Sequence, residues 1–331
     1  MKTLFALLFC TITFANPVNT DPIEKRIETL DKMFVQLESR IANPAWLDTD
    51  SYRAFKKSLY SEESLKMSDE QLVLFINTER KKLPFTHFSL SMKKSKSQAS
   101  GSDAQPYISW RPINEQTALL SVGGFPTDPS NMIKAVNQIG VDKYNNLIID
   151  LRGNDGGSLD AGVILARFLT TEPLDAGFYL TRKWFDNHGR QATIEDMAGF
   201  PFLEDFTYAG ITKMYQQEAF RMVLPGHNNP TFQGTVYVLS DNISASACEP
   251  LLDIVKEMEI ATVVGERSNG AMLSAYWFDV NEDFRVQIPI ADYQTARGDR
   301  LDKVGVMPDV LVPSQEALDH VLNVLIPESK N

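Results

Sequence analysis

The sequence predicts an α/β protein in which a mixed core follows a small helical N-terminal domain. Apolar residues recur at three- and four-residue steps between positions 23 and 41, as they do on one face of a helix. From about residue 118 to residue 265, short apolar runs typical of strands alternate with stretches typical of helices. This alternation favours a sheet whose strands are joined by helical crossovers.

The first residues are typical of a secretory signal peptide. Lys2 precedes an apolar run that ends at Phe14, and the small residues Thr13 and Ala15 stand where a cleavage site needs them. The run is too short to span a bilayer, which takes about 20 apolar residues. We expect residues 1–15 to be removed and the product to be periplasmic or extracellular. A buried N-terminal strand or helix is the alternative.

Composition excludes several classes of protein. The net charge of −11 argues against nucleic acid and anionic membranes as partners. No later segment is long and apolar enough to span a membrane. Cleavage after Ala15 leaves one cysteine, Cys248, so no intramolecular disulfide can form. His, Cys and acidic residues do not cluster with metal-ligand spacing, and we expect neither a metal nor another cofactor.

The elements follow in order along the chain. Residues 16–85 form the helical domain, where Ser68 and Gln71 make a capping box at the start of a helix. Residues 86–331 form the core, which begins with a strand at 88–92 and a Ser-rich loop at 93–102. Further strands are expected at 118–122, 147–151, 236–239 and 261–265, and helices at 128–140, 163–169 and 251–258.

An aromatic-rich stretch at about 171–233 interrupts this alternation, and parts of it look helical, around residues 210–222. We interpret it as an insertion that covers or flanks the functional site. A peripheral subdomain with its own small core is the equal alternative.

Two turns carry residues suited to chemistry. After the strand at 147–151, Gly156 and Gly157 form a glycine-rich turn before a helix, where free backbone N–H groups can bind an anion or an oxyanion. After the strand at 236–239, Ser246 stands among small residues where another helix begins, so its hydroxyl is uncrowded. Taken alone, the glycine-rich turn could be an ordinary tight turn, and Ser246 could be an ordinary serine that caps a helix.

Together the turns resemble the carboxyl-terminal processing (tail-specific) serine protease family. Four motifs of that family occur in order, D-L-R-x-N-x-G-G, S-A-S-A-x-E, G-E-x-[ST]-x-G and G-V-x-P-D, at residues 150–157, 244–249, 265–270 and 305–309. The resemblance covers roughly residues 85–312. It implies a crotonase-like β/α spiral core, a peptide or protein substrate, Ser246 as nucleophile, and an oxyanion hole made by the N–H groups of Gly157 and Ala247.

The chain departs from the family pattern in two places. Ala271 occupies the position of the lysine used by one branch, so another base is needed. The tricorn-like branch is similar in using an upstream histidine, and its pattern implies His87 as general base, with Thr86 and Asp302 as its hydroxyl and carboxylate partners. The segment between His87 and the core is also too short for the PDZ module that many members carry.

The sequence therefore predicts a secreted serine-type peptidase that acts through Ser246 and His87. A non-catalytic ligand- or peptide-binding protein on the same scaffold is the alternative. An acyl-thioester enzyme of the crotonase type is disfavoured by the S-A-S-A-C-E motif.

Overall fold

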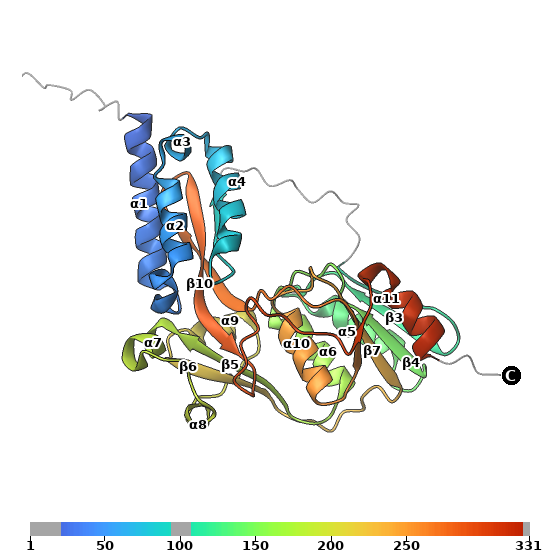
Figure 1. Ribbon diagram of the computed structural model, residues 1–331. Coiled ribbons are helices and arrows are strands. Elements are labelled where there is room, and N and C mark those ends of the chain that lie inside the picture. Colours follow the sequence, from blue (N-terminus) through green and yellow to red (C-terminus); the bar gives the residue numbers. More distant parts are fainter. Residues whose placement is uncertain (1–20, 94–106, 327–331) are drawn as a thin grey trace, which may run out of the picture.

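The computed structural model describes residues 21–93 and 107–326. The predicted signal peptide, residues 1–15, and nearly all of the predicted Ser-rich loop lie outside the described residues. Figure 1 shows an upright lobe, in which the N-terminal helices surround the upper part of strand β10, beside a second lobe built on a different sheet. Within the described ranges, no helix has both the length and the hydrophobicity needed to cross a bilayer.

The second lobe is built on a six-stranded sheet of order β11-β8-β7-β4-β3-β2. Its strands are β2 (Ile108–Pro112), β3 (Thr117–Val122), β4 (Asn146–Asp150), β7 (Thr235–Ser240), β8 (Thr262–Gly265) and β11 (Val310–Leu311). All neighbours are parallel except β2 and β3. Helices α5 (Ser130–Ile139), α6 (Leu159–Leu169) and α10 (Cys248–Glu257) provide the crossovers.

Both faces of this sheet are covered, which explains the continuous apolar run in β4. Leu147 and Ile149 belong to the large core that α5, α6 and α10 share with the sheet. Ile148 points to the other face, where it packs in a core that includes Ala317 and Val321. These two residues come from α11 (Ala317–His320) and the π-helical turn Val321–Leu325 that continues it. Successive side chains of a strand point to opposite faces of the sheet. Where both faces are covered, as they are at β4, consecutive side chains are buried and are therefore apolar.

The second sheet is antiparallel and links the two lobes. Its order is β1-β10-β5-β6, with β9 also paired to β10. The strands are β1 (Ser89–Met92), β5 (Leu174–Thr181), β6 (Ala219–Leu224), β9 (Leu273–Asp279) and β10 (Phe284–Gln294). Between β5 and β6 lie α7 (Arg182–His188), α8 (Ile194–Met197) and α9 (Tyr208–Met214).

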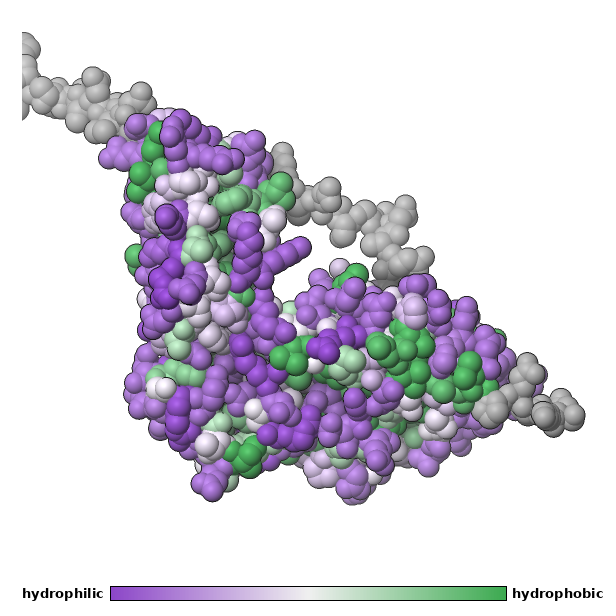
Figure 2. All heavy atoms as spheres, viewed as in Figure 1, coloured by the Kyte–Doolittle hydropathy of each residue, from purple (hydrophilic) through white to green (hydrophobic). Residues whose placement is uncertain are grey.

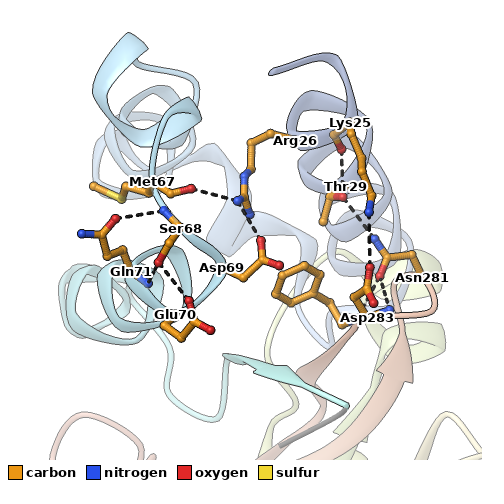
Figure 3. A network of polar contacts seen from close by, with 11 residues as sticks. Lys25, Arg26, Thr29, Met67, Ser68, Asp69, Glu70, Gln71, Asn281 and Asp283 are labelled. Atoms are coloured by element: carbon orange, nitrogen blue, oxygen red, sulfur yellow. Dashed lines mark hydrogen bonds and ion pairs between the residues drawn. The ribbon is translucent and has the colours of Figure 1, made fainter. Parts of the chain in front are cut away.

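The N-terminal helices pack on this second sheet. They are α1 (Pro22–Arg40), α2 (Asp50–Leu59), α3 (Glu62–Leu65) and α4 (Asp69–Glu79). Their apolar faces share one core with Val286 and Ile288 of β10. At the tip of the lobe, Asn281 in the β9–β10 turn donates to the Thr29 hydroxyl at 3.1 Å (Figure 3).

The mixed α/β class and the helical N-terminal region are confirmed, and the predicted capping box of Ser68 and Gln71 is present. The prediction of helix around residues 210–222 is wrong in its second half. Helix α9 ends at Met214, and residues 219–224 form strand β6 because they pair with β5 and bury alternate side chains. The stretch at 171–233 thus supplies two strands of the second sheet. It also contains a small apolar cluster of its own around Phe178, Trp184 and Phe200.

Candidate active site

Sheet topology brings the two predicted turns together. Strands β4 and β7 are parallel neighbours, with Asp150 opposite Leu239, so the turns that follow them lie at the same edge of the sheet. Asn154 ties the turns to each other. Its buried side chain donates to the carbonyl of Val122 at 2.9 Å and accepts from Gly156 N at 2.9 Å, while its own carbonyl accepts from Ala245 N at 3.0 Å.

The turn between β7 and α10, which contains Ser246 and which we call the serine turn, has an uncommon backbone conformation. Ser246 has φ of +55°, in the left-handed region that non-glycine residues rarely adopt. Its N–H donates to the carbonyl of Ala271 at 3.0 Å. Left-handed residues outside glycine cost free energy and concentrate at functional sites. His87 is also left-handed, with φ of +57°.

Among the described residues, the glycine turn pairs with Phe125 through the groups on either side of the Gly157 N–H. Phe125 N donates to Gly156 O and Ser158 N donates to Phe125 O. The N–H of Gly157, between these two groups, therefore points to the opposite side. Gly157 has φ of +133°, and a β-carbon on it would overlap the Phe125 carbonyl. Only glycine fits this position.

His87 is held by Thr86 and Asp302, which lie 216 residues apart in the sequence. The Thr86 hydroxyl donates to the Asp302 carboxylate, and Thr86 Oγ1 lies 2.9 Å from His87 Nδ1. A hydroxyl has one proton to donate, and here Asp302 accepts it. We infer that Thr86 accepts a hydrogen bond from Nδ1–H of His87. The lone pair of the neutral imidazole is then on Nε2.

Burial and neighbouring charges set the protonation of this group. Burial, reinforced by the positive charge of Arg80, lowers the pKa of His87 to about 4. Burial raises the pKa of Asp302 to about 6, although its bond with Thr86 and the charge of Arg300 oppose the shift. Arg300 pairs with Asp302 at 3.1 Å. At neutral pH the histidine is neutral and the aspartate is ionised.

An open cavity of about 1020 Å³ joins four of the six predicted site residues, and Thr86 and Asp302 do not border it. It is bordered by His87, Gly157, Ser246 and Ala247, and we call it the serine cavity. The segment at 171–233 contributes Tyr179, Tyr208 and Tyr215 to its wall. Among the described residues, no direct hydrogen bond joins Ser246 to His87. A second, apolar pocket of about 560 Å³ adjoins the serine cavity, and Ser158, Leu159 and Ala247 border both.

Comparison with known proteins gives the family. Residues 116–312, more than half of the chain, match Peptidase family S41. The chain belongs to this family. The resemblance to carboxyl-terminal processing proteases is therefore confirmed, while membership of the tricorn-like branch remains a prediction.

Curated relatives of this S41 protein are processing proteases of photosynthetic organisms. A carboxyl-terminal-processing protease of Picosynechococcus sp. is 26% identical over 189 residues, which cover 56% of this chain and 36% of that protein. A chloroplastic C-terminal processing peptidase of Tetradesmus obliquus is 27% identical over 164 residues, 50% of this chain and 28% of that protein. The chain thus spans about a third of the length of these relatives.

Solved structures show the fold over nearly the whole chain. A candidate peptidase from Parabacteroides merdae superposes with a TM-score of 0.61 at 14% identity, covering 93% of this chain and 98% of that one. A lipoprotein from Streptococcus agalactiae gives 0.56 at 15% identity, with coverage of 95% and 98%.

The S41 motifs contain one site residue to which the sequence analysis gave no role. The side chain of Glu249 is buried at the start of α10 and accepts four hydrogen bonds. Its Oε1 accepts from Ser268 Oγ at 2.6 Å and Gly270 N at 2.8 Å. Its Oε2 accepts from Ala271 N at 2.9 Å and Ser246 N at 3.3 Å. Burial raises the pKa of Glu249 to about 7. The available signal was a glutamate that ends the S-A-S-A-x-E motif, just before the helix expected at 251–258.

Other predicted features of this S41 chain can be placed as well. Ala271, at the lysine position, supplies the carbonyl that holds Ser246 N, and Ser244 is buried with its hydroxyl donating to Leu151 O at 2.8 Å. His188 lies 3.3 Å from Glu218, away from the serine cavity. Within residues 21–93 and 107–326, no group of His, Cys and acidic residues could hold a metal.

Proposed function

We propose that this chain is a serine peptidase in which Ser246 is the nucleophile and His87 is the general base. The observation that carries the proposal is the serine cavity, which His87, Ser246, Gly157 and Ala247 all border. Family S41 membership supports a peptide or protein as substrate. The N-terminal pattern at residues 1–15 supports export to the periplasm or the extracellular space.

The chemistry follows from the protonation of the site. Nε2 of neutral His87 takes the proton of Ser246 as Oγ attacks the substrate carbonyl carbon. The N–H groups of Gly157 and Ala247 bind the oxyanion that forms, with Ala247 directly preceding helix α10. The histidine then protonates the leaving amine, and water hydrolyses the acyl-enzyme by the same route.

Asp302 acts through Thr86 in this proposal. The Thr86 hydroxyl keeps His87 in the tautomer that leaves Nε2 free, and the negative charge of Asp302 stabilises the imidazolium that forms. The pKa of His87 near 4 ensures that the base is unprotonated at neutral pH, although it makes the group a weak base. Hydrogen bonds of catalytic groups often become direct only when substrate is bound.

The rival function is non-catalytic binding on the same scaffold. The lack of a direct Ser246–His87 bond among the described residues, together with the tyrosines around the cavity, favours this rival. Reaction with a serine-directed fluorophosphonate, followed by mass-spectrometric mapping, separates the two. We expect the label on Ser246 and none on the nearby Ser244, whose hydroxyl is already bonded to Leu151. A protein that remains unlabelled at Ser246 would be a binder.

A further inference from the structure

A second open cavity, of about 1360 Å³, also borders His87 but not Gly157 or Ala247, the proposed oxyanion-binding residues. We call it the basic cavity, because Arg80, Lys81 and Lys303 border it. His87, Asp155 and Gln287 border both cavities, so a peptide that passes His87 can extend from one into the other. Figure 2 shows a hollow between the two lobes, at the level where they join.

None of the three cations of the basic cavity forms an ion pair within the part of the chain that the structure describes. No carboxylate of residues 21–93 and 107–326 lies within 4.0 Å of their charged nitrogens. Arg80 instead donates to the carbonyls of Asn77 and Phe88, and Lys303 donates to the carbonyl of Lys81 at 3.2 Å. Carbonyls satisfy hydrogen bonds but carry no net negative charge.

Nearby carboxylates reduce the positive charge but do not reverse it. Asp302, beside Lys303, accepts from Thr86 and pairs with Arg300, which also pairs with Asp292, so one guanidinium charge faces two carboxylates. Among the described residues, Asp155 is the one carboxylate that borders the cavity. Three cations against one anion leave a net positive charge in a chain whose total charge is −11.

The proposed mechanism assigns a direction to the substrate. The acyl part stays on Ser246 with its carbonyl oxygen at Gly157 and Ala247, so its side chain faces the apolar pocket that Ala247 and Leu159 border. The leaving amine must reach the imidazole of His87, which donates its proton. The leaving part of the substrate therefore lies beyond His87, in the basic cavity.

We propose that the basic cavity binds a carboxylate on the leaving part of the substrate. This inference rests on the proposed function, because the direction of the substrate comes from its mechanism. The carboxylate is either the C-terminal group of a short leaving peptide or the side chain of an acidic residue close to the cleaved bond. In both cases Arg80, Lys81 and Lys303 supply the attraction.

The test measures binding separately from catalysis. Three N-terminally fluorescein-labelled hexapeptides of alanine and valine are compared by anisotropy on the Ser246→Ala protein. The first has a free C-terminal carboxylate, the second a C-terminal amide, and the third an amide with a glutamate as its fifth residue. We expect the first or the third to bind more tightly than the second, and the preference to shrink as salt is raised from about 0.1 M to 1 M.

Variants locate the effect in the basic cavity. Lys81→Gln and Lys303→Gln should each reduce the preference by about 2- to 5-fold, the range of a partly exposed charge pair. Lys82→Gln is the matched control, because Lys82 is adjacent in sequence but pairs with Glu79 at 2.7 Å and does not border the cavity. Arg80 is left unchanged because it donates to the carbonyls of Asn77 and Phe88, and Phe88 directly follows His87.

The outcomes separate this proposal from the function on which it rests. Tighter binding of the free acid identifies a C-terminal carboxylate, and tighter binding of the glutamate peptide identifies a side chain. Equal binding of all three peptides, or a preference that both lysine variants retain, overturns the proposal even if wild-type protein is labelled at Ser246. If the protein prefers a carboxylate peptide but is never labelled at Ser246, the result would support the anion site and contradict the proposed peptidase activity.

Discussion

Gly156 lies against Ser246 so closely that a β-carbon on the glycine would be 2.5 Å from the β-carbon of the serine. The same added atom would lie 3.1 Å from the serine oxygen. Gly156 also has φ of +108°, which other residues rarely adopt. The glycine turn therefore sets the position of the Ser246 side chain, the proposed nucleophile.

Gly156→Ala should accordingly displace Ser246 and lower kcat/KM by about 100-fold or more, on the scale of losing one essential site interaction. Gly153→Ala is the matched control, because Gly153 has φ of +74° in the same turn but no atom within 4 Å of an added β-carbon. Both variants carry backbone strain of about 1–2 kcal/mol, and only the first crowds the serine. Equal activities of the two variants would contradict the account of this turn.

Thr86→Val should lower kcat/KM by about 10-fold or more with little loss of stability. Valine keeps the shape of the side chain but cannot accept the proton of His87 Nδ1 or donate to Asp302. Thr86→Ser retains the hydroxyl and should recover most of the activity. A serine variant as slow as the valine variant would show that packing, and not the hydrogen bond, is what Thr86 contributes.

Glu249→Gln should slow the labelling of Ser246 and lower the free energy of unfolding by about 1–3 kcal/mol. All four groups around the carboxylate are donors, so the amide NH₂ of glutamine would face two of them. Glu257→Gln on the same helix is the control, because Glu257 is half exposed in its pair with Arg297. Labelling measured well below the unfolding temperature shows whether Glu249 positions the serine turn. An unchanged labelling rate would limit Glu249 to a structural role.

Some of this site could be predicted from local sequence, because each turn follows a strand that the hydrophobic pattern reveals. Gly157 and Ser246 belong to turns whose small residues and preceding apolar runs are contiguous in sequence. The roles of Glu249 and of the basic cavity could not be predicted in this way. The bonding partners of Glu249 include residues 19 to 22 positions away, and Lys81 meets Lys303 across 222 positions.

The second sheet was predicted only at β1, the strand expected at 88–92, and its other strands escaped prediction for a physical reason. Strand β10 contains Pro289, which cannot donate to a sheet ladder, and its pairing with β9 shifts register between Pro289 and Ala291. Strand β5 contains Gly177, and its pairing with β6 is irregular between Asp175 and Phe178. Such irregularities break the alternation of apolar and polar residues by which strands are recognised.

The pH dependence of kcat/KM should show two falls on the acid side. Asp302 has a pKa of about 6, so its protonation on lowering the pH through 6 removes the charge that stabilises the imidazolium. His87 has a pKa of about 4, and below that value it cannot accept the serine proton. Asp302→Asn should lower the activity at pH 7 and abolish the fall near 6. A single fall near 6.5 that persists in Asp302→Asn would indicate an ordinary solvated histidine and contradict this arrangement.

The central claim, that His87 activates Ser246, is tested most directly by the second-order rate of fluorophosphonate labelling at Ser246 in wild type and in His87→Asn. Asparagine tolerates the left-handed backbone at this position but offers no basic nitrogen. General-base catalysis is worth about 10²- to 10⁴-fold, so we predict a loss of at least 100-fold at pH 7. Equal labelling rates in the two proteins would show that His87 is not the base.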